Sequence, residues 1–250
     1  MSLTPVYNRI FIEGNGGKTI TTAITRGIAF IGGECPRPEQ CRRLLASARE
    51  PLETRCSLLV VAADSGLIAA EAAGIAPDWV VGDMDSLDAL ARLAQYPPER
   101  VIRYPVDKDY TDTELALALL WEQGAQETWL IGGGGGRLDH LFAIRALFER
   151  ERCPDRWITR NADSYCLREQ RQISLSLPRG SLVSLFPLGD SPWNARSHGL
   201  KWPLDGLRWD RGSFGVSNVA QSRDISVYSD AGRFLLITEA VSSGTRSVQT

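Results

Sequence analysis

A change of pattern near residue 160 constrains the fold of this chain more than any other feature of its sequence. Before that point, short apolar runs such as Leu58 to Ala62 alternate with segments of helical periodicity, for example 38–50 and 111–124. The apolar runs are hydrophobic throughout rather than at every second residue, which is typical of parallel strands covered by helices. We therefore expect residues 27–162 to form an α/β domain, a doubly wound, mostly parallel sheet with helices on both faces.

The rest of the chain follows a different pattern. After about Asp163 the helical periodicity disappears, and short strand-like pieces are separated by Gly, Pro, Asn and Asp. We expect residues 163–250 to form an antiparallel β domain of the sandwich or barrel-like kind. Residues 1–26 fit neither pattern, although the β-branched run "TITTAIT" favours an added strand or hairpin there.

Composition excludes several classes of partner. The formal net charge is −2, so we expect no nucleic-acid partner, which usually needs a basic face. No stretch approaches the roughly 18 apolar residues needed to span a bilayer, and the first residues lack the pattern of a signal peptide. The five cysteines are scattered and never form a C-x-x-C pair, which fits reduced thiols. We therefore expect a cytoplasmic protein that acts on small substrates.

Acidic residues gather after three strand-like segments of the α/β part. Ligands of doubly wound sheets bind beyond the carboxyl ends of the strands, where these residues fall. Residues i and i+2 of an extended segment point the same way, so two aspartates in "GDMDS" can face one ligand, with Gly82 keeping the backbone close. The three groups are Asp64 after "LLVVAA", Asp83 and Asp85 after "WVVG", and Asp107, Asp109 and Asp112 after "VIRYPV".

This acidic set predicts a bound cation. Single aspartates after strands are common turn formers, and that interpretation stays open for any one of them. Six carboxylates in one place repel each other unless a cation neutralises them. With oxygen ligands and no histidine nearby, Mg²⁺ is favoured over zinc, and Mg²⁺ in proteins usually accompanies substrate phosphates.

Two helix starts complete the predicted site. Thr111 and Glu114 have the spacing of a capping box, which places Asp112 in the first turn of a helix. The glycine run 132–136 lies between a strand and a helix, so its backbone N–H groups can approach anionic oxygens, with Arg137 as a bidentate donor. A flexible turn is the alternative. His140, on the following helix, fits either a catalytic or a structural role.

Six segments then occur together in the order and with the spacing of one known family. They are "AADSG", "APDWVVGDMDS", "DKDYTDTELAL", "GGRLDH", "GLKWPL" and "FGVSN". From about Gly27 to Ile237 the chain resembles thiamine pyrophosphokinase. The resemblance implies Mg²⁺-dependent transfer of a diphosphate from ATP to thiamine, giving thiamine diphosphate and AMP. It also implies an ATP-binding α/β domain, a thiamine-binding β domain, and a homodimer whose sites are shared between chains.

The resemblance further implies roles for individual residues. Asp64, Asp83, Asp85 and Asp112 match the aspartates that surround magnesium and the ATP phosphates, the last three as metal ligands. The chain departs from the family at Ser65, where A-D-G-G is common, in its longer glycine run, and in residues 1–26. Ligand-binding roles are implied for Asp107, Lys108, Asp109, Thr111, Gly136, Arg137 and Asp139 near the nucleotide, and for Ser217 and Asn218 at the thiamine pyrimidine.

Three other functions are compatible with parts of the sequence. A phosphatase of the haloacid dehalogenase type uses the first aspartate of a D-x-D as nucleophile, but usually on its first strand. A pterin diphosphokinase, acting on hydroxymethyl-dihydropterin, differs from a thiamine diphosphokinase only in its acceptor pocket. A non-catalytic thiamine or nucleotide sensor has no need of so many metal ligands.

Overall fold

The computed structural model describes residues 24–49, 56–84 and 92–240. The predicted hairpin in residues 1–26 lies outside the described residues except for its last three, which open strand β1 (Ile24–Phe30). No helix among the described residues is long and apolar enough to cross a membrane.

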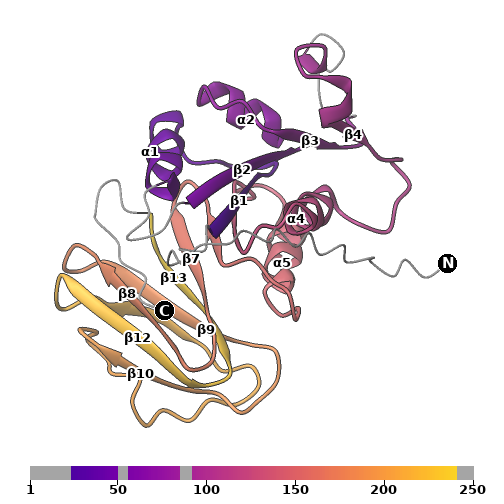
Figure 1. Cartoon of the computed structure of the whole chain (residues 1–250). Coiled ribbons are helices and arrows are strands. Elements are labelled where there is room, and N and C mark those ends of the chain that lie inside the picture. The colour runs from indigo at the N-terminus through magenta and orange to yellow at the C-terminus, as the bar shows by residue number, and fades with distance from the viewer. Residues whose placement is uncertain (1–23, 50–55, 85–91, 241–250) are drawn as a thin grey trace, which may run out of the picture.

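One sheet of ten strands runs through most of the molecule, in the order β11-β9-β13-β7-β6-β5-β1-β2-β3-β4 (Figure 1). The strands from β6 to β4 in that order pair in parallel, and those from β7 to β11 pair antiparallel. The parallel part consists of β1, β2 (Cys56–Ala63), β3 (Trp79–Gly82), β4 (Val101–Arg103), β5 (Glu127–Ile131) and β6 (Arg156–Ile158).

Helices cover both faces of the parallel part, as predicted. Successive side chains of a strand point to opposite faces. Ile28 and Phe30 of β1 therefore pack in one buried cluster with the first pair of helices, whereas Ala29 and Ile31 pack with the second pair. Figure 1 shows the two pairs on opposite sides of the sheet. The first pair is α1 (Pro38–Arg49) and α2 (Gly66–Ala72), and the second is α4 (Asp112–Glu122) and α5 (Leu138–Leu147); a short 3-10 turn, η1, spans Pro98–Arg100.

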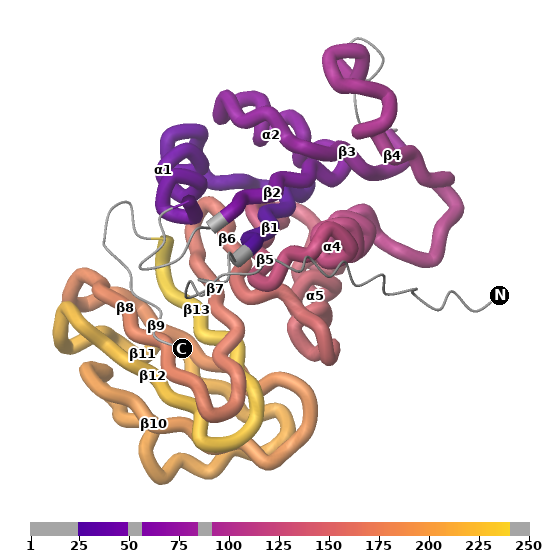
Figure 2. The backbone as a smooth tube through the Cα atoms, in the orientation of Figure 1, coloured from indigo at the N-terminus to yellow at the C-terminus, as the bar shows by residue number. Residues whose placement is uncertain are grey.

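The C-terminal part is a β-sandwich that shares the main sheet with the α/β part. A second sheet, in the order β10-β12-β8, packs on the antiparallel end of the main sheet through one buried apolar cluster (Figure 2). The predicted fold class is confirmed, with the addition that β6 and β7 pair directly and join the two parts. The strands are β7 (Ala162–Leu167), β8 (Arg171–Ser176), β9 (Leu182–Leu188), β10 (Asn194–His198), β11 (Gly215–Val219), β12 (Asp224–Ala231) and β13 (Arg233–Glu239).

Candidate active site

Three of the predicted aspartates meet at the carboxyl ends of β2 and β3. Asp64 and Asp83 follow these neighbouring strands directly, and Asp112 is the first residue of α4. A Cβ atom at Gly82 would lie 3.2 Å from Asp112 Oδ1 and 3.2 Å from Asp64 Cβ. The glycine, whose φ is +141°, therefore leaves the space that the two carboxylates share.

Lys108 is the cation of this cluster. Its Nζ lies 2.8 Å from Asp83 Oδ2 and 3.1 Å from Asp112 Oδ1, and the side chains of Lys108 and Asp83 are each only 12% exposed. Burial opposes the charge on Lys108, but the hydrogen bonds to Asp83 and Asp112 outweigh it and raise the pKa of the amine. The lysine therefore remains protonated between the carboxylates at neutral pH.

Within the described residues, three carboxylates meet beside the ammonium group of Lys108. Burial raises the pKa of Asp112, and the negative charges of Asp83 and Asp64 raise it further, although Lys108 acts in the opposite direction. Asp64 Oδ1 is buried and accepts no hydrogen bond from any described residue. An unsatisfied carboxylate oxygen beside like charges is a place where a further positive charge is stabilised.

The electron-pair donors of the cluster fit a hard divalent cation in their chemistry, because Asp64, Asp83 and Asp112 supply carboxylate oxygens. Among the described residues, no three carboxylate, imidazole or thiol groups already converge as metal ligands. Lys108 stands between two of the predicted ligands, and Asp85, the third, lies outside the described residues. The geometry thus brings the acidic residues together, and the Mg²⁺ site stays a prediction.

The expected geometry of the D-x-D segment is wrong. β3 ends at Gly82, and Met84 has a φ of +63°, in the left-handed region. The segment is therefore not extended between its two aspartates, and the rule that residues i and i+2 point the same way does not apply to it. The pattern of "WVVG" predicts a strand, but it does not indicate that the methionine two residues after Gly82 adopts a left-handed backbone conformation.

The capping box at the start of α4 is confirmed. Thr111 Oγ1 accepts a hydrogen bond from the backbone N–H of Glu114, and Glu114 Oε2 accepts one from the N–H of Thr111. The cap fixes the first turn, and with it Asp112. Asp107 and Asp109 are exposed in the preceding loop.

The glycine run serves packing more than ligand binding. The N–H groups of Gly132, Gly133 and Gly134 donate to carbonyls of the protein, at Ile158, Gly32 and Glu34 respectively. The prediction that these three present their N–H groups to anionic oxygens is therefore wrong. The sequence signal of a phosphate-binding loop and that of a tight backbone crossing are the same, since both require glycine.

The exposed end of the run leads into a polar pair. Gly136 is exposed, and Arg137 donates two hydrogen bonds to Asp139, with Nε–Oδ1 and Nη2–Oδ2 distances of 3.1 and 2.5 Å. The guanidinium lowers the pKa of Asp139 to about 2. His140 is exposed on α5, which does not fit a role in packing.

The second predicted ligand pair lies on β11. Ser217 is exposed with a φ of +60°, while Asn218 is buried and holds a neighbouring loop. Asn218 Nδ2 donates to the carbonyl of Trp202 at 2.6 Å, and its Oδ1 accepts from the Trp202 N–H at 3.1 Å. Asn218 and Trp202 also line an apolar cavity of about 180 Å³ together with Leu185, Leu204 and Val216. This cavity was not predicted, because residues from four segments form it.

The two candidate regions of one chain lie at opposite edges of the main sheet. β11 is one edge strand, and β3 is next to the other edge (Figure 2). Eight inter-strand spacings of about 4.8 Å separate them, or about 38 Å measured along the sheet. The acidic cluster and the Ser217–Asn218 pair are therefore far apart within a single chain.

The fold has two parts. A doubly wound sheet carries carboxylates at its strand ends, and it continues into a β-sandwich with its own apolar cavity. This arrangement is typical of an enzyme with a two-part ligand-binding site. Two family models match the chain, that of the thiamin pyrophosphokinase catalytic domain over residues 52–154 and that of the thiamin pyrophosphokinase vitamin B1 binding domain over residues 170–234. Together they cover more than half of the chain. The chain belongs to the thiamin pyrophosphokinase family.

Solved structures have the same fold. Thiamin pyrophosphokinase from Geobacillus thermodenitrificans is 25% identical with a TM-score of 0.65, over 88% of this chain and 99% of its own. The enzyme from Bacillus subtilis is 22% identical with a TM-score of 0.68, over 87% and 99%. That from Candida albicans is 15% identical with a TM-score of 0.63, over 86% and 89%. A comparison with curated proteins gave no match.

Proposed function

We propose that this protein is a magnesium-dependent thiamine diphosphokinase, which transfers a diphosphate from ATP to thiamine and releases AMP. The family catalyses diphosphate transfer to thiamine. The observation that carries the proposal is the half-buried cluster of Asp64, Asp83 and Asp112 with Lys108 at the strand ends. The D-x-D follows the third strand within the described residues, which argues against a phosphatase with a nucleophile on its first strand.

The chemistry requires charge neutralisation. The acceptor oxygen attacks the β-phosphorus in line while AMP leaves, so negative charge accumulates on the phosphate oxygens. Asp83, Asp85 and Asp112 would hold Mg²⁺, which supplies Lewis-acid stabilisation of that charge when bound. Lys108 contributes a permanent positive charge to the same place, and Asp64 Oδ1 is an acceptor available to a ligand.

The direct test uses the purified protein with MgCl₂, ATP and either thiamine or hydroxymethyl-dihydropterin. We expect AMP and thiamine diphosphate with thiamine, and neither product without Mg²⁺. ADP as the product would assign another reaction class, and AMP formed only with the pterin would assign the other acceptor. Asp83→Asn should lower kcat by orders of magnitude with an unchanged circular dichroism spectrum.

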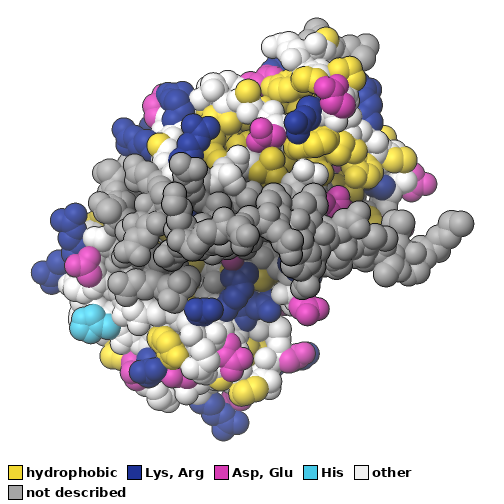
Figure 3. Space-filling model, viewed as in Figure 1, with side chains coloured by type: hydrophobic (Ala, Val, Ile, Leu, Met, Phe, Trp, Pro, Cys, Tyr) yellow, Lys and Arg dark blue, Asp and Glu magenta, His cyan; other side chains and the backbone are white. Residues whose placement is uncertain are grey.

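We further propose that the active site is shared between two chains of a homodimer. The separation of β11 from β3 supports this, because one chain cannot bring its Asn218 to its own Asp83 across the sheet. Trp202, Leu207, Phe214 and Val216 are large apolar side chains exposed around the cavity, as expected of a surface that another chain covers. Hydrophobic side chains also gather on the α/β half of the face in Figure 3.

Complementation tests the shared site. Asp83→Asn and Asn218→Ala should each be nearly inactive alone, whereas co-expression yields mixed dimers with one intact site. Random pairing then restores about a quarter of wild-type activity. Mixed dimers purified with two different affinity tags that show no recovery would place the whole site within one chain.

The proposed location is the cytoplasm. Cys35, Cys41, Cys153 and Cys166 are unpaired, as reduced thiols are in that compartment.

A further inference from the structure

Two buried thiols lie against each other where the α/β part meets the sandwich. Cys153 is in the turn between α5 and β6, and Cys166 is in β7. Their Sγ atoms are 3.6 Å apart, and the two residues are only 3% and 7% exposed. A disulfide has an S–S bond of about 2.05 Å, so the two sulfurs must approach each other by about 1.5 Å to form one.

Two guanidinium groups flank one sulfur of this pair. Arg168 Nη2 lies 3.6 Å and Arg233 Nη1 3.5 Å from Cys153 Sγ. Arg233 is held in place because the same nitrogen donates to the carbonyls of Phe148 and Arg150. Positive charges beside a sulfur stabilise the thiolate and disfavour a bound metal cation.

The two thiols are consequently unequal. The hydrogen bond from the Cys166 thiol lowers the pKa of Cys153, and Arg168 and Arg233 lower it further, although burial acts in the opposite direction. The pKa of Cys166 is raised, because its proton serves that hydrogen bond and its site is buried. The two arginines beside its sulfur favour the thiolate of Cys153 over that of Cys166.

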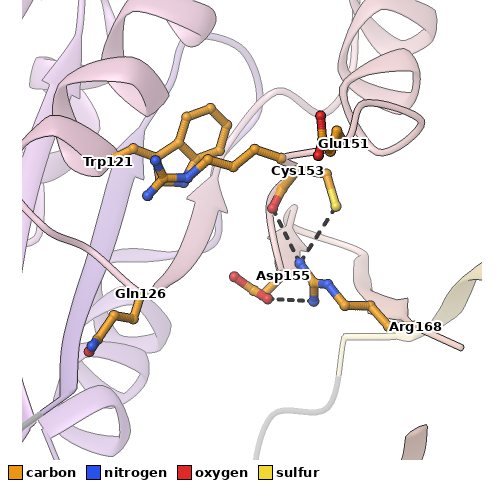
Figure 4. Close-up of a pocket in the computed structure, with 7 residues that line it drawn as sticks. Trp121, Gln126, Glu151, Cys153, Asp155 and Arg168 are labelled. Carbon is orange, nitrogen blue, oxygen red and sulfur yellow. Dashed lines mark hydrogen bonds and ion pairs between the residues drawn. The ribbon is translucent and has the colours of Figure 1, made fainter. Parts of the chain in front are cut away.

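A cavity reaches the nucleophilic residue. Cys153 lines a polar cavity of about 390 Å³ together with Trp121, Arg152, Asp155 and Arg168 (Figure 4). Figure 4 shows the Arg168 guanidinium directed toward Asp155 and Cys153, and Arg168 Nη1 lies 2.6 Å from Asp155 Oδ1. A molecule as small as hydrogen peroxide can enter such a space.

We propose that Cys153 and Cys166 form a redox-active pair, which a peroxide entering this cavity converts to a disulfide. The Cys153 thiolate attacks one peroxide oxygen, the O–O bond breaks, and the leaving hydroxide takes a proton to become water. Cys166 sulfur then attacks the sulfenic acid on Cys153, the S–O bond breaks, and the second hydroxide leaves as water with the Cys166 proton. The two thiols lose two electrons and two protons, and the peroxide becomes two waters.

Cys41 is an internal comparison. It is as deeply buried, but its Sγ contacts the Pro36 carbonyl at 3.5 Å, and burial raises its pKa to about 11. A thiol of this kind is protonated and reacts slowly with peroxide.

The experiment treats the intact protein with hydrogen peroxide, blocks remaining thiols with iodoacetamide, and maps the tryptic peptides by mass spectrometry. Trypsin cleaves beside both cysteines, so the disulfide joins peptides 153–156 and 161–168, "CPDR" and "NADSYCLR". We expect this linked peptide in the wild type and in the Cys35→Ser control, and its disappearance after dithiothreitol. Oxidation of Cys153 should be at least about tenfold faster than that of Cys41.

Cys166→Ser separates the steps. In this variant Cys153 should stop at the sulfenic acid, which dimedone labels, and no linked peptide should form. Wild-type protein in which Cys153 and Cys166 are both alkylated after peroxide, or in which Cys153 is over-oxidised without a link, would overturn the proposal. Stoichiometric zinc released by a chelator from the untreated protein would overturn it as well.

Discussion

The ion pair of Arg156 and Asp163 should be the most sensitive polar contact in the fold. It lies where β6, the last parallel strand, pairs with β7, the first antiparallel one. Arg156 Nε and Nη2 donate to the two carboxylate oxygens at 2.7 and 2.6 Å, and the residues are only 6% and 2% exposed. Replacing Arg156 by Met leaves Asp163 buried without its cation, whereas Asp163→Leu leaves a buried guanidinium.

The structure predicts that the two substitutions lower the free energy of unfolding by unequal amounts. Removing one partner of a buried pair destabilises by about 3–5 kcal/mol, and we expect Arg156→Met in this range. Asp163→Leu should cost less, because the guanidinium remains over the rings of Trp129 and Tyr165, at 4.5 and 5.1 Å from their centroids. A desolvated cation–π contact contributes roughly 2 kcal/mol, which places this loss at about 1–3 kcal/mol. The double variant removes both charges and should be more stable than either single one.

Urea unfolding followed by tryptophan fluorescence and by circular dichroism measures these free energies, and coincident curves establish a single transition. In a thermal scan the Arg156→Met loss corresponds to a decrease in Tm of roughly 10 °C. If the double variant lost as much free energy of unfolding as the two single variants together, the reasoning would be refuted. The effects of independent contacts on stability are additive, whereas those of the two members of a charge pair are not.

Three further predictions concern the site. Thr111→Ala removes the cap of α4 and should destabilise by about 1 kcal/mol in urea, with Thr111→Ser as a neutral control. Gly132→Ala puts a Cβ atom 2.3 Å from the Ile31 carbonyl oxygen at a φ of +115°. We therefore expect Gly132→Ala to lower the Tm far more than Gly136→Ala does, because the space around Gly136 is open. Lys108→Met removes the charge that lowers the pKa of Asp112, so this pKa rises further above its ordinary value of 3.8. The folded state then binds a proton that the unfolded state has lost, and the stability of the variant relative to wild type should fall as pH rises above 3.8; a constant difference from pH 4 to 7 would contradict this.

Much of the fold follows from periodicity alone. The run Leu58 to Ala62 is apolar on both faces because helices cover both, and the Thr111 cap is a local signal that needs no tertiary contact. Strand β6 escaped prediction because it has only three residues and begins with a charged one. Its Arg156 is accommodated in the sheet because Asp163 of the neighbouring strand β7 accepts its hydrogen bonds. A local sequence pattern does not indicate a partner on another strand.

The candidate site shows the same division. The aspartates at the strand ends were predictable, since the topology of a doubly wound sheet gathers strand ends at one edge. The position of Lys108 between Asp83 and Asp112 depends on how the loop before α4 folds back, which sequence does not encode locally. The approach of Cys166 to Cys153 likewise depends on the pairing of β7, because thirteen residues separate them without a C-x-x-C motif.

The continuity of the sheet gives the proposed two-chain site a structural reason. A chain with an acidic cluster near one sheet edge and Asn218 at the other cannot join them by bending, because eight inter-strand spacings of hydrogen-bonded backbone lie between. A dimer with a two-fold axis would solve this problem. When β11 of one chain meets the acidic edge of its partner, symmetry forms a second, identical site. The hydrogen-bonded connection through β6 and β7 would then fix the distance between the two sites of the proposed dimer. An Arg156→Met dimer that remains folded should therefore lose activity at both sites together, and mixed dimers with wild type should be impaired at both.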